Sequence, residues 1–361
     1  MRAPLAVGFL ATLGLIGQSP DTYRWDLPKG FPRPYVPADN PMTQKKVELG
    51  RGLFYDARTS VNGKGSCATC HRQELAFTDG RAVSIGVTGQ LHPRNAMSLV
   101  NVAYSGALTW ANPQMKRLEQ QALTPMYGEH PLELGLREGD GFLRALRFDP
   151  DYRARFASAF PGEPDPIVTG NVTKALACFE RSIISARSPY DRYHYGGDDN
   201  AISASAKRGE ILFFDQQHSC FRCHGGFNFS SDTVSDRNPN REIEFHNTGL
   251  YNLAGAFSYP LENLGIYEYT KAPPDVGKFK APTLRNIAVT APYMHDGGIR
   301  TLGEVLDHYA AGGRAHGNPN RDALVHGFEI SARDRADLIA FLESLTDEAV
   351  LSDPRFADPR K

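Results

Sequence analysis

Apolar residues recur at helical spacing in three separate parts of this chain. Residues three or four positions apart share one face of an α-helix, so each stripe predicts a helix that packs through that face. Thr301 with Glu304 forms a capping-box pattern before the second stripe, and Ser331 precedes the third. The stripes are Val172, Leu176, Phe179 and Ile183; Leu302, Val305, Leu306 and Tyr309; and Leu338, Phe341, Leu342 and Leu345.

A repeated pattern of glycine and aromatic residues divides the chain in two. Residues 50–56 read GRGLFYD and residues 209–215 read GEILFFD. Each follows a predicted helix start, at Thr43 and at Ser203 or Ser205. The turn-rich residues 188–199 are the predicted linker between the halves. Long loops rich in Gly, Pro and Asn separate the helices, so the predicted fold class is mainly α with long loops.

Length and charge limit the classes of function that this chain can have. The chain has 361 residues, enough for two domains, and its formal net charge of −1 gives no basic excess for binding nucleic acid.

Residues 5–16 are apolar between Arg2 and a polar run from Gln18, which predicts a secretory signal over residues 1–19. A membrane anchor is the alternative, but the run is short for a bilayer. No later segment is apolar enough to span one.

Two short segments carry the chemistry. The pattern C-x-x-C-H is the attachment signature of a c-type haem, because two thiols add to the porphyrin vinyl groups and the adjacent histidine binds the iron. We therefore predict two covalently bound haem c groups. Such attachment takes place outside the cytoplasm, which agrees with export to the periplasm. The segments are Cys67-Ala-Thr-Cys70-His71 and Cys220-Phe-Arg-Cys223-His224.

Zinc binding and dithiol redox chemistry are the competing interpretations of these cysteines. Structural zinc needs four ligands close together, and the two segments lie far apart in the sequence. A thioredoxin-like motif needs alternating strands and helices, which the pattern does not predict. The fifth cysteine, Cys178, lies within the first helical stripe and is predicted to be a small packing residue.

Each haem motif follows one copy of the repeat, which predicts two cytochrome c-like domains. The glycine allows a second helix to approach closely, and the phenylalanine packs beside the haem. The predicted domains are residues 20–195, with the first haem, and residues 196–361, with the second haem.

Further motifs accompany the haem segments: Pro93-Arg94-Asn95, Trp110, Ser188-Pro-Tyr-Asp191, FKAPTLRNIAVTAPYMH at 279–295, Trp25-Asp-Leu-Pro, HRQELAFTD at 71–79, GEHPLE at 128–133 and HGGFNF at 224–229. With them the chain resembles the bacterial di-haem cytochrome c peroxidase and MauG superfamily, and most closely its MbnH-type enzymes. The match covers nearly the whole mature chain.

The resemblance also bears on the second ligand of each iron, on the side opposite the motif histidine. Many family peroxidases carry a histidine after a Ser-Val-Gly-like stretch, whereas this chain has Val87 after Ser84-Ile-Gly. Val87 has no lone pair for iron, which implies an open first haem, and His92 is then a loop histidine. At the second haem those peroxidases use methionine, and counting places Tyr309 there, as in MauG. Met294 and His308 are competing ligands.

The resemblance also implies a distal pocket for peroxide. One carboxylate can move the proton between the two peroxide oxygens. Glu133 fits the family's Glu-Met-Gly pattern better than the neighbouring Glu129 or His130. Two further elements complete the pocket: Gln121, with Gln120 as the alternative, and Pro125, which covers part of the haem face.

Two more features follow from the resemblance. Trp110 corresponds to the residue between the haems, where an indole can pass charge by hopping, and otherwise it is a buried interdomain aromatic. A calcium ion between the haems would be held by the side chain of Asn95 and the carbonyls of Thr290 and Pro292, since Ca²⁺ prefers oxygen donors. Trp25 is predicted to be a packing residue.

Three function classes remain in competition at this point. The first uses hydrogen peroxide to form a high-valent two-haem state that oxidises a tryptophan on a periplasmic partner protein, giving kynurenine or a similar product. The second reduces hydrogen peroxide with electrons from a small redox protein. The third is a non-enzymatic di-haem electron carrier, which would want both irons six-coordinate.

Overall fold

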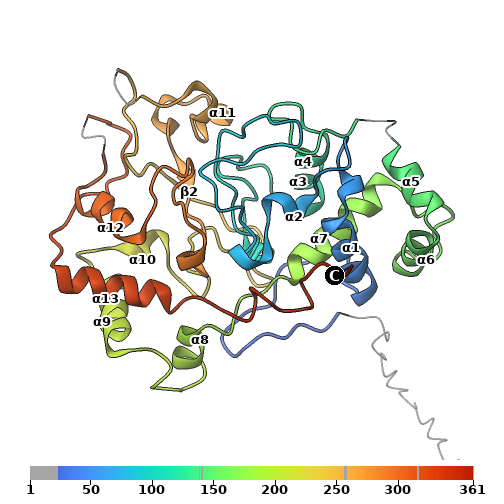
Figure 1. Cartoon of the computed structure of the whole chain (residues 1–361). Helices are drawn as coiled ribbons and strands as arrows, with labels where there is room; N and C mark the ends of the chain where they lie inside the picture. Colours follow the sequence, from blue (N-terminus) through green and yellow to red (C-terminus); the bar gives the residue numbers. More distant parts are fainter. Residues whose placement is uncertain (1–22, 138, 140, 256–257, 315–316, 361) are drawn as a thin grey trace, which may run out of the picture.

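Helices and long loops make up nearly all of the described chain (Figure 1). The computed structural model describes residues 23–137, 139, 141–255, 258–314 and 317–360, so the predicted signal at 1–19 lies outside it. The helices are α1 (Gln44–Tyr55), α2 (Cys67–Cys70), α3 (Leu118–Gln121), α4 (Leu123–Tyr127), α5 (Phe142–Phe148), α6 (Pro150–Ala159), α7 (Thr169–Ser182), α8 (Pro189–His194), α9 (Ala204–Phe213), α10 (Cys220–Cys223), α11 (Tyr267–Thr270), α12 (Leu302–Ala310) and α13 (Ala332–Glu343). Short 3₁₀ turns span 57–59, 73–75, 102–104, 261–263, 273–275 and 287–289.

Regular sheet within the described ranges is confined to one short pair of strands. β1 (Phe245–His246) runs antiparallel to β2 (Phe279–Lys280), with Phe245 opposite Lys280. The predicted mainly α class is confirmed. None of the described helices is long and apolar enough to cross a membrane.

The predicted helix starts are confirmed by side-chain caps. Thr43, Ser203 and Ser331 each accept a hydrogen bond from a backbone N–H in the first turn of their helix. Thr301 and Glu304 form the predicted capping box of α12. These caps satisfy N–H groups that a helix start leaves without an intrahelical partner. Cys178 is fully buried in α7, as predicted.

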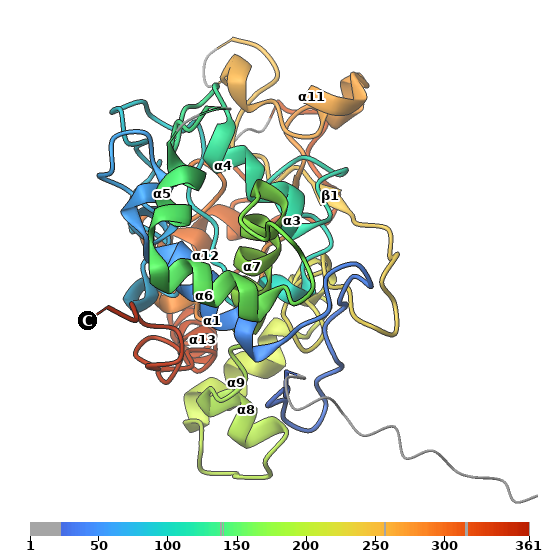
Figure 2. The same ribbon diagram turned by 90° about the vertical axis from the view of Figure 1, so that its right-hand side faces the viewer.

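Two helix pairs, each crossing at a glycine, form the framework. α1 packs against α7, and α9 packs against α13 (Figures 1 and 2). A Cβ added at Gly50 would lie 1.9 Å from the carbonyl oxygen of Ala175, and one at Gly209 would lie 1.9 Å from that of Asp337. Glycine is therefore the residue that lets each pair approach so closely.

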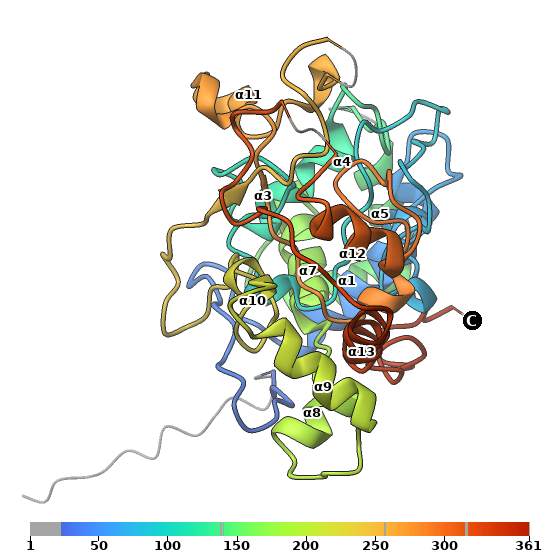
Figure 3. The same cartoon turned by 90° about the vertical axis from the view of Figure 1, so that its left-hand side faces the viewer.

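Each helix pair has its own apolar cluster. The first cluster contains Phe54 and Phe179, and the second contains Phe213 and Phe341. Figure 3 shows α13 beside α9, with α12 above it. The domain boundary at 195/196 stays a prediction.

The C-terminal segment returns to the first half of the molecule. Val350 and Phe356 belong to the first apolar cluster, although they follow α13. The Tyr55 hydroxyl donates to the carbonyl of Phe356 at 2.7 Å, and Gln73 Nε2 donates to that of Val350 at 3.1 Å. The end of the chain accordingly lies beside α1 (Figure 1).

The predicted linker contains more structure than its turn-rich sequence indicated. Ser188 and Asp191 form a capping box, and Pro189 occupies the first turn of α8. Arg285 Nη1 makes an ion pair with Asp191 Oδ2 at 2.8 Å, and both side chains are buried. A buried contact therefore fixes this segment to the second half.

Candidate active site

Both C-x-x-C-H motifs adopt the same local structure. Their cysteines span the single-turn helices α2 and α10, and the histidine N–H bonds back to the first cysteine carbonyl at 3.0 Å in each. Burial raises the pKa of Cys67 and Cys220, and that of Cys70 to about 11. A redox dithiol needs the opposite shift. Among the described residues no cluster of three or more His, Cys, Asp or Glu side chains suits a metal ion, so the zinc alternative lacks a ligand set.

The two motif histidines are oriented by backbone carbonyls. His71 Nδ1 lies 2.8 Å from the carbonyl oxygen of Phe77, and His224 Nδ1 lies 3.1 Å from that of Pro282. Burial lowers the pKa of His71, and that of His224 to about 4, so both rings are neutral. A neutral imidazole that donates through Nδ1 presents the lone pair of Nε2, as an iron ligand must.

One large cavity joins the two motifs. Its volume is about 1210 Å³, and its lining includes Cys67, Cys70 and His71 as well as Cys220, Cys223 and His224. Ordinary ligand pockets occupy about 300–1,000 Å³. Unpaired cysteines, histidines with fixed tautomers and a cavity of this size together fit two haem groups.

The first motif faces a pocket built by a hairpin and a loop. Val87 N–H donates to the carbonyl of Glu133 at 2.8 Å, and Ile85 bridges Leu91 within the hairpin. Burial raises the pKa of Glu133 to about 7. His92 Nε2 lies 3.6 Å from Glu133 Oε1.

The second ring nitrogen of His92 contacts the backbone of Arg94. His92 Nδ1 lies 3.1 Å from both the nitrogen and the carbonyl oxygen of Arg94, and these contacts fit either neutral tautomer. Burial lowers the pKa of His92, which favours a neutral ring. The histidine predicted to be a loop residue is thus a neighbour of the predicted acid–base group.

The structure separates the alternatives that the sequence left open in this pocket. Gln121, Pro125 and Glu133 line the cavity. Gln120 and Glu129 are exposed and do not belong to its lining. His130 lines the cavity from an exposed position. Their catalytic roles stay predictions.

Tyr309 and Met294 line the cavity on the side of the second motif. His308 is turned away, because its Nε2 lies 2.8 Å from the carbonyl oxygen of Thr248. Burial and the neighbouring Cys223 and Cys220 raise the pKa of Tyr309, so the free phenol is neutral. The geometry leaves Tyr309 and Met294 as candidate ligands.

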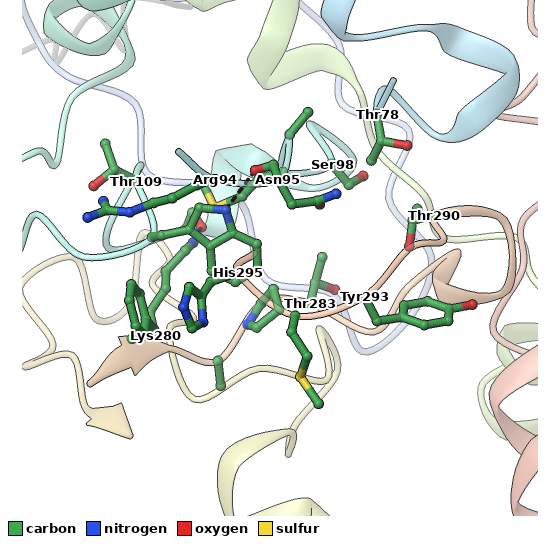
Figure 4. A pocket seen from close by; sticks show the side chains of 18 of the residues that line it. Thr78, Arg94, Asn95, Ser98, Thr109, Lys280, Thr283, Thr290, Tyr293 and His295 are labelled. Atoms are coloured by element: carbon green, nitrogen blue, oxygen red, sulfur yellow. Dashed lines mark hydrogen bonds between the residues drawn. The ribbon is translucent and has the colours of Figure 1, made fainter. Parts of the chain in front are cut away.

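Trp110 lies in the cavity wall between the halves. Its Nε1–H donates to the carbonyl of Asn95 at 2.8 Å, drawn as a dashed line in Figure 4. His295 lies across from Arg94 and Asn95 in the same view, with its ring centroid 6.5 Å from that of Trp110. The indole is 9% exposed and so belongs to the interior.

The predicted calcium ligands border the same cavity. Asn95, Thr290 and Pro292 all line it, and Asn95 Nδ2 donates to the carbonyl of Arg81 at 2.7 Å. That bond leaves the Asn95 side-chain oxygen available. In the described ranges no hydrogen bond reaches the carbonyl oxygens of Thr290 and Pro292. This oxygen set is compatible with Ca²⁺, and the ion stays a prediction.

The sequence did not reveal one ion pair at the second motif. His246 lines the cavity, and its Nδ1 lies 2.6 Å from Asp322 Oδ2. Burial alone would lower the pKa of His246, but Asp322 and the Cys223 sulfur together outweigh burial and raise it to about 10. His246 lies in β1 and Asp322 lies in a distant loop, and no local spacing pattern connects them.

Comparison with known proteins agrees with this geometry. A family model described as di-haem cytochrome c peroxidase matches residues 44–200. The methylamine utilization protein MauG of Methylorubrum extorquens is 36% identical over 329 residues, covering 90% of this chain and 84% of that protein. The chain belongs to the di-haem cytochrome c peroxidase family. It is thus a haem peroxidase-type oxidoreductase, and the family implies two haem c cofactors.

Two further relatives show the breadth of this family. Cytochrome-c peroxidase IdrP1 of Denitromonas iodatirespirans is 35% identical, covering 89% of this chain and 87% of that protein. The crystal structure of a MauG-like protein associated with microbial copper homeostasis is 44% identical, with a TM-score of 0.91, covering 94% of this chain and 100% of that one. The family resemblance predicted from the motifs is confirmed.

Proposed function

We propose that this protein is a periplasmic enzyme that uses hydrogen peroxide to oxidise a tryptophan on a partner protein, giving kynurenine or a similar product. The observation that carries this proposal is the shared cavity, in which Glu133 borders one haem motif, Tyr309 borders the other and Trp110 lies in the wall. Two unlike haem environments around one buried indole suit storage of oxidising equivalents for a substrate that never reaches iron.

The first motif supplies the peroxide chemistry in this proposal. Bound haem would supply iron that takes up peroxide and the two electrons needed to break the O–O bond. Glu133 takes the proton from the inner oxygen and returns it to the outer oxygen, which leaves as water. Gln121 and Pro125 shape the pocket, and Val87 leaves the iron face without a protein ligand.

In this proposal, the iron ligand at the second motif distinguishes the protein from a simple electron carrier. A phenolate oxygen favours higher oxidation states of iron, whereas a methionine sulfur favours Fe(II). Metal ligands bind in their deprotonated form, so Tyr309 loses its proton when it binds. Trp110 connects the two environments, and a calcium ion on Asn95, Thr290 and Pro292 would fix their spacing.

A second candidate function is reduction of hydrogen peroxide with electrons from a small redox protein. One observation favours it: Met294 lines the same cavity as Tyr309. The relatives named cytochrome-c peroxidase are also about as similar to this chain as MauG is.

One titration distinguishes the two functions. Stoichiometric hydrogen peroxide is added to the purified, fully oxidised protein, and the optical and near-infrared spectra are followed. A rapid, long-lived change shared by both haems supports the proposed function. No reaction until one haem has been reduced contradicts it and favours the second candidate. Mass spectrometry of a co-incubated partner then identifies the oxidised residue.

A further inference from the structure

An array of rings leads from Trp110 toward the protein surface. The His295 ring centroid lies 6.5 Å from that of Trp110 and 6.4 Å from that of Tyr251. Tyr251 in turn lies 5.1 Å from Tyr259. His295 is held in place by stacking on Phe279, with 3.6 Å between centroids and 14° between planes. The array is therefore continuous and fixed by packing.

Exposure changes along this array. Trp110 is 9% exposed and Tyr259 is 7% exposed, whereas Tyr251 is half-buried and residues 253–255 after it are exposed. Tyr251 is not one of the residues that line the haem cavity. It is thus the position at which the array leaves the interior.

The hydroxyl of Tyr251 has a proton acceptor in place. It donates a hydrogen bond to Asp296 Oδ2, while Asp296 Oδ1 accepts the Gly298 N–H at 2.8 Å. A phenol that loses an electron becomes strongly acidic, so oxidation is easiest where a carboxylate already holds the proton. Burial and Asp296 raise the pKa of Tyr251 while Arg314 lowers it, and the resting phenol is neutral.

A second tyrosine–aspartate pair shows that this bond alone is not distinctive. Tyr152 donates to Asp56 Oδ2 at 2.8 Å in the interior of the first half. Its aromatic neighbour is Phe156, and the Arg58 guanidinium lies over its ring. In the described part of the chain, no ring contact joins Tyr152 to Trp110. What distinguishes Tyr251 is the combination of an acceptor with a ring array.

We propose that Tyr251 is a redox-active tyrosine through which oxidising equivalents leave Trp110 toward a docked protein substrate. This inference rests on the proposed function, which supplies hydrogen peroxide as the oxidant through the haem groups. In the step, one electron passes from Tyr251 to oxidised Trp110 across His295. The phenol O–H bond breaks and its proton moves to Asp296 Oδ2. Trp110 is restored and Tyr251 becomes a neutral radical, which is reduced by one electron from the substrate together with the proton returned by Asp296.

The test is freeze-quench electron paramagnetic resonance on the haem-loaded full chain. Fully oxidised protein made with ring-deuterated tyrosine is mixed with one equivalent of hydrogen peroxide. We expect a tyrosyl signal that narrows on deuteration and is lost in Tyr251→Phe, although both haem optical changes still form. Trp110→Phe loses the signal as well. Asp296→Asn keeps the phenol but lowers the radical yield, because its proton acceptor is gone.

Tyr152→Phe is the matched control and retains the signal. A tyrosyl signal that persists in Tyr251→Phe overturns the inference, as does a wild-type optical change without any tyrosyl signal. The absence of any optical change in wild type contradicts the proposed function, and the inference falls with it. Circular dichroism checks that each variant folds. If Tyr251→Phe does not fold, the lower radical yield expected of Asp296→Asn tests the role of Tyr251 instead.

Discussion

The two halves of the molecule share a framework and differ in what faces the cavity. In both, a helix pair crosses at a glycine and a C-x-x-C-H turn follows, with its histidine bonded to a backbone carbonyl. The first half then presents Glu133 beside His92, while the second presents Tyr309. The comparison teaches that the repeat accounts for what the two halves share, while the residues in which they differ at the cavity, Glu133 and Tyr309, lie outside the repeat.

The largest expected effect comes from breaking the shared framework. Gly50→Val and Gly209→Val each force a side chain against a backbone carbonyl 1.9 Å from the added Cβ. We expect each to destabilise the protein by more than about 3 kcal/mol or to prevent folding. Urea unfolding measures the loss.

A helical glycine with free space around it is the control for this pair. A Cβ at Gly170 meets nothing within 4 Å, so Gly170→Ala should leave stability unchanged or raise it by up to about 1 kcal/mol. Unfolding midpoints of Gly50→Val and Gly209→Val equal to wild type would refute the shared close approach.

The next effect sharpens the difference on the side of the first half. Glu133→Gln should slow the reaction with peroxide by about 10²–10⁴-fold, because the amide cannot take up a proton. Since burial raises the pKa of Glu133 to about 7, the wild-type rate should rise as pH increases through about 7. Stopped-flow spectroscopy gives both the rate and its pH profile.

Exposed Glu129 provides the matched variant, and Glu129→Gln should keep the wild-type rate and profile. A normal rate in Glu133→Gln, with a normal pH profile, would assign the proton transfer to another group. His92, at 3.6 Å from Glu133, would be the first to examine.

A third variant replaces Tyr309, the group that the second half presents to the cavity. Tyr309→Met should raise the potential of the second haem, on the order of 100 mV or more, because a thioether favours Fe(II). It should also abolish the spectral change shared by both haems. Spectroelectrochemical titration measures the potential.

Tyr293→Phe serves as the comparison, since the Tyr293 hydroxyl bonds to the carbonyl of Ile287. Its potential should match wild type. An unchanged potential in Tyr309→Met would identify Met294 as the ligand.

The smallest effect concerns the His246–Asp322 ion pair in the second half. Asp322 raises the pKa of His246, and the bond to His246 lowers the pKa of Asp322. The pair therefore stabilises the fold most between about pH 4 and 6.5, and this stability is lost as pH rises through the raised pKa of His246. We expect Asp322→Asn to cost about 1–3 kcal/mol in that window.

Thermal unfolding as a function of pH tests this expectation. Glu244 lies 3.8 Å from His246 Nε2 but is 65% exposed, so Glu244→Gln should have little effect. A loss of stability in Asp322→Asn that stays constant up to pH 10 would show that the charge of His246 is not involved.

Local signals explain what could be predicted from the sequence. Thr43, Thr301 and Ser331 each cap a helix within one turn, so their capping roles can be predicted from the local sequence alone. The haem motifs are equally local. Helix α8 was missed because Pro189 and Gly196 mark turns as readily as helix ends.

Contacts between distant segments explain what could not be predicted. The Glu133 side chain meets His92 only because a hairpin and a loop are brought together by backbone bonding at Val87. Tyr251 meets Asp296 through the packing of two apolar clusters. Such pairs have no fixed spacing, so no sequence pattern identifies them.

The return of the C-terminal segment to α1 sets an order of events during synthesis. Gln73, two residues after the first haem motif, is anchored by the carbonyl of Val350, and Tyr55 by that of Phe356. The first apolar cluster is therefore complete only after the residues that follow α13 have been made. A chain cut short after α13 would leave this cluster, not the second one, without part of its members.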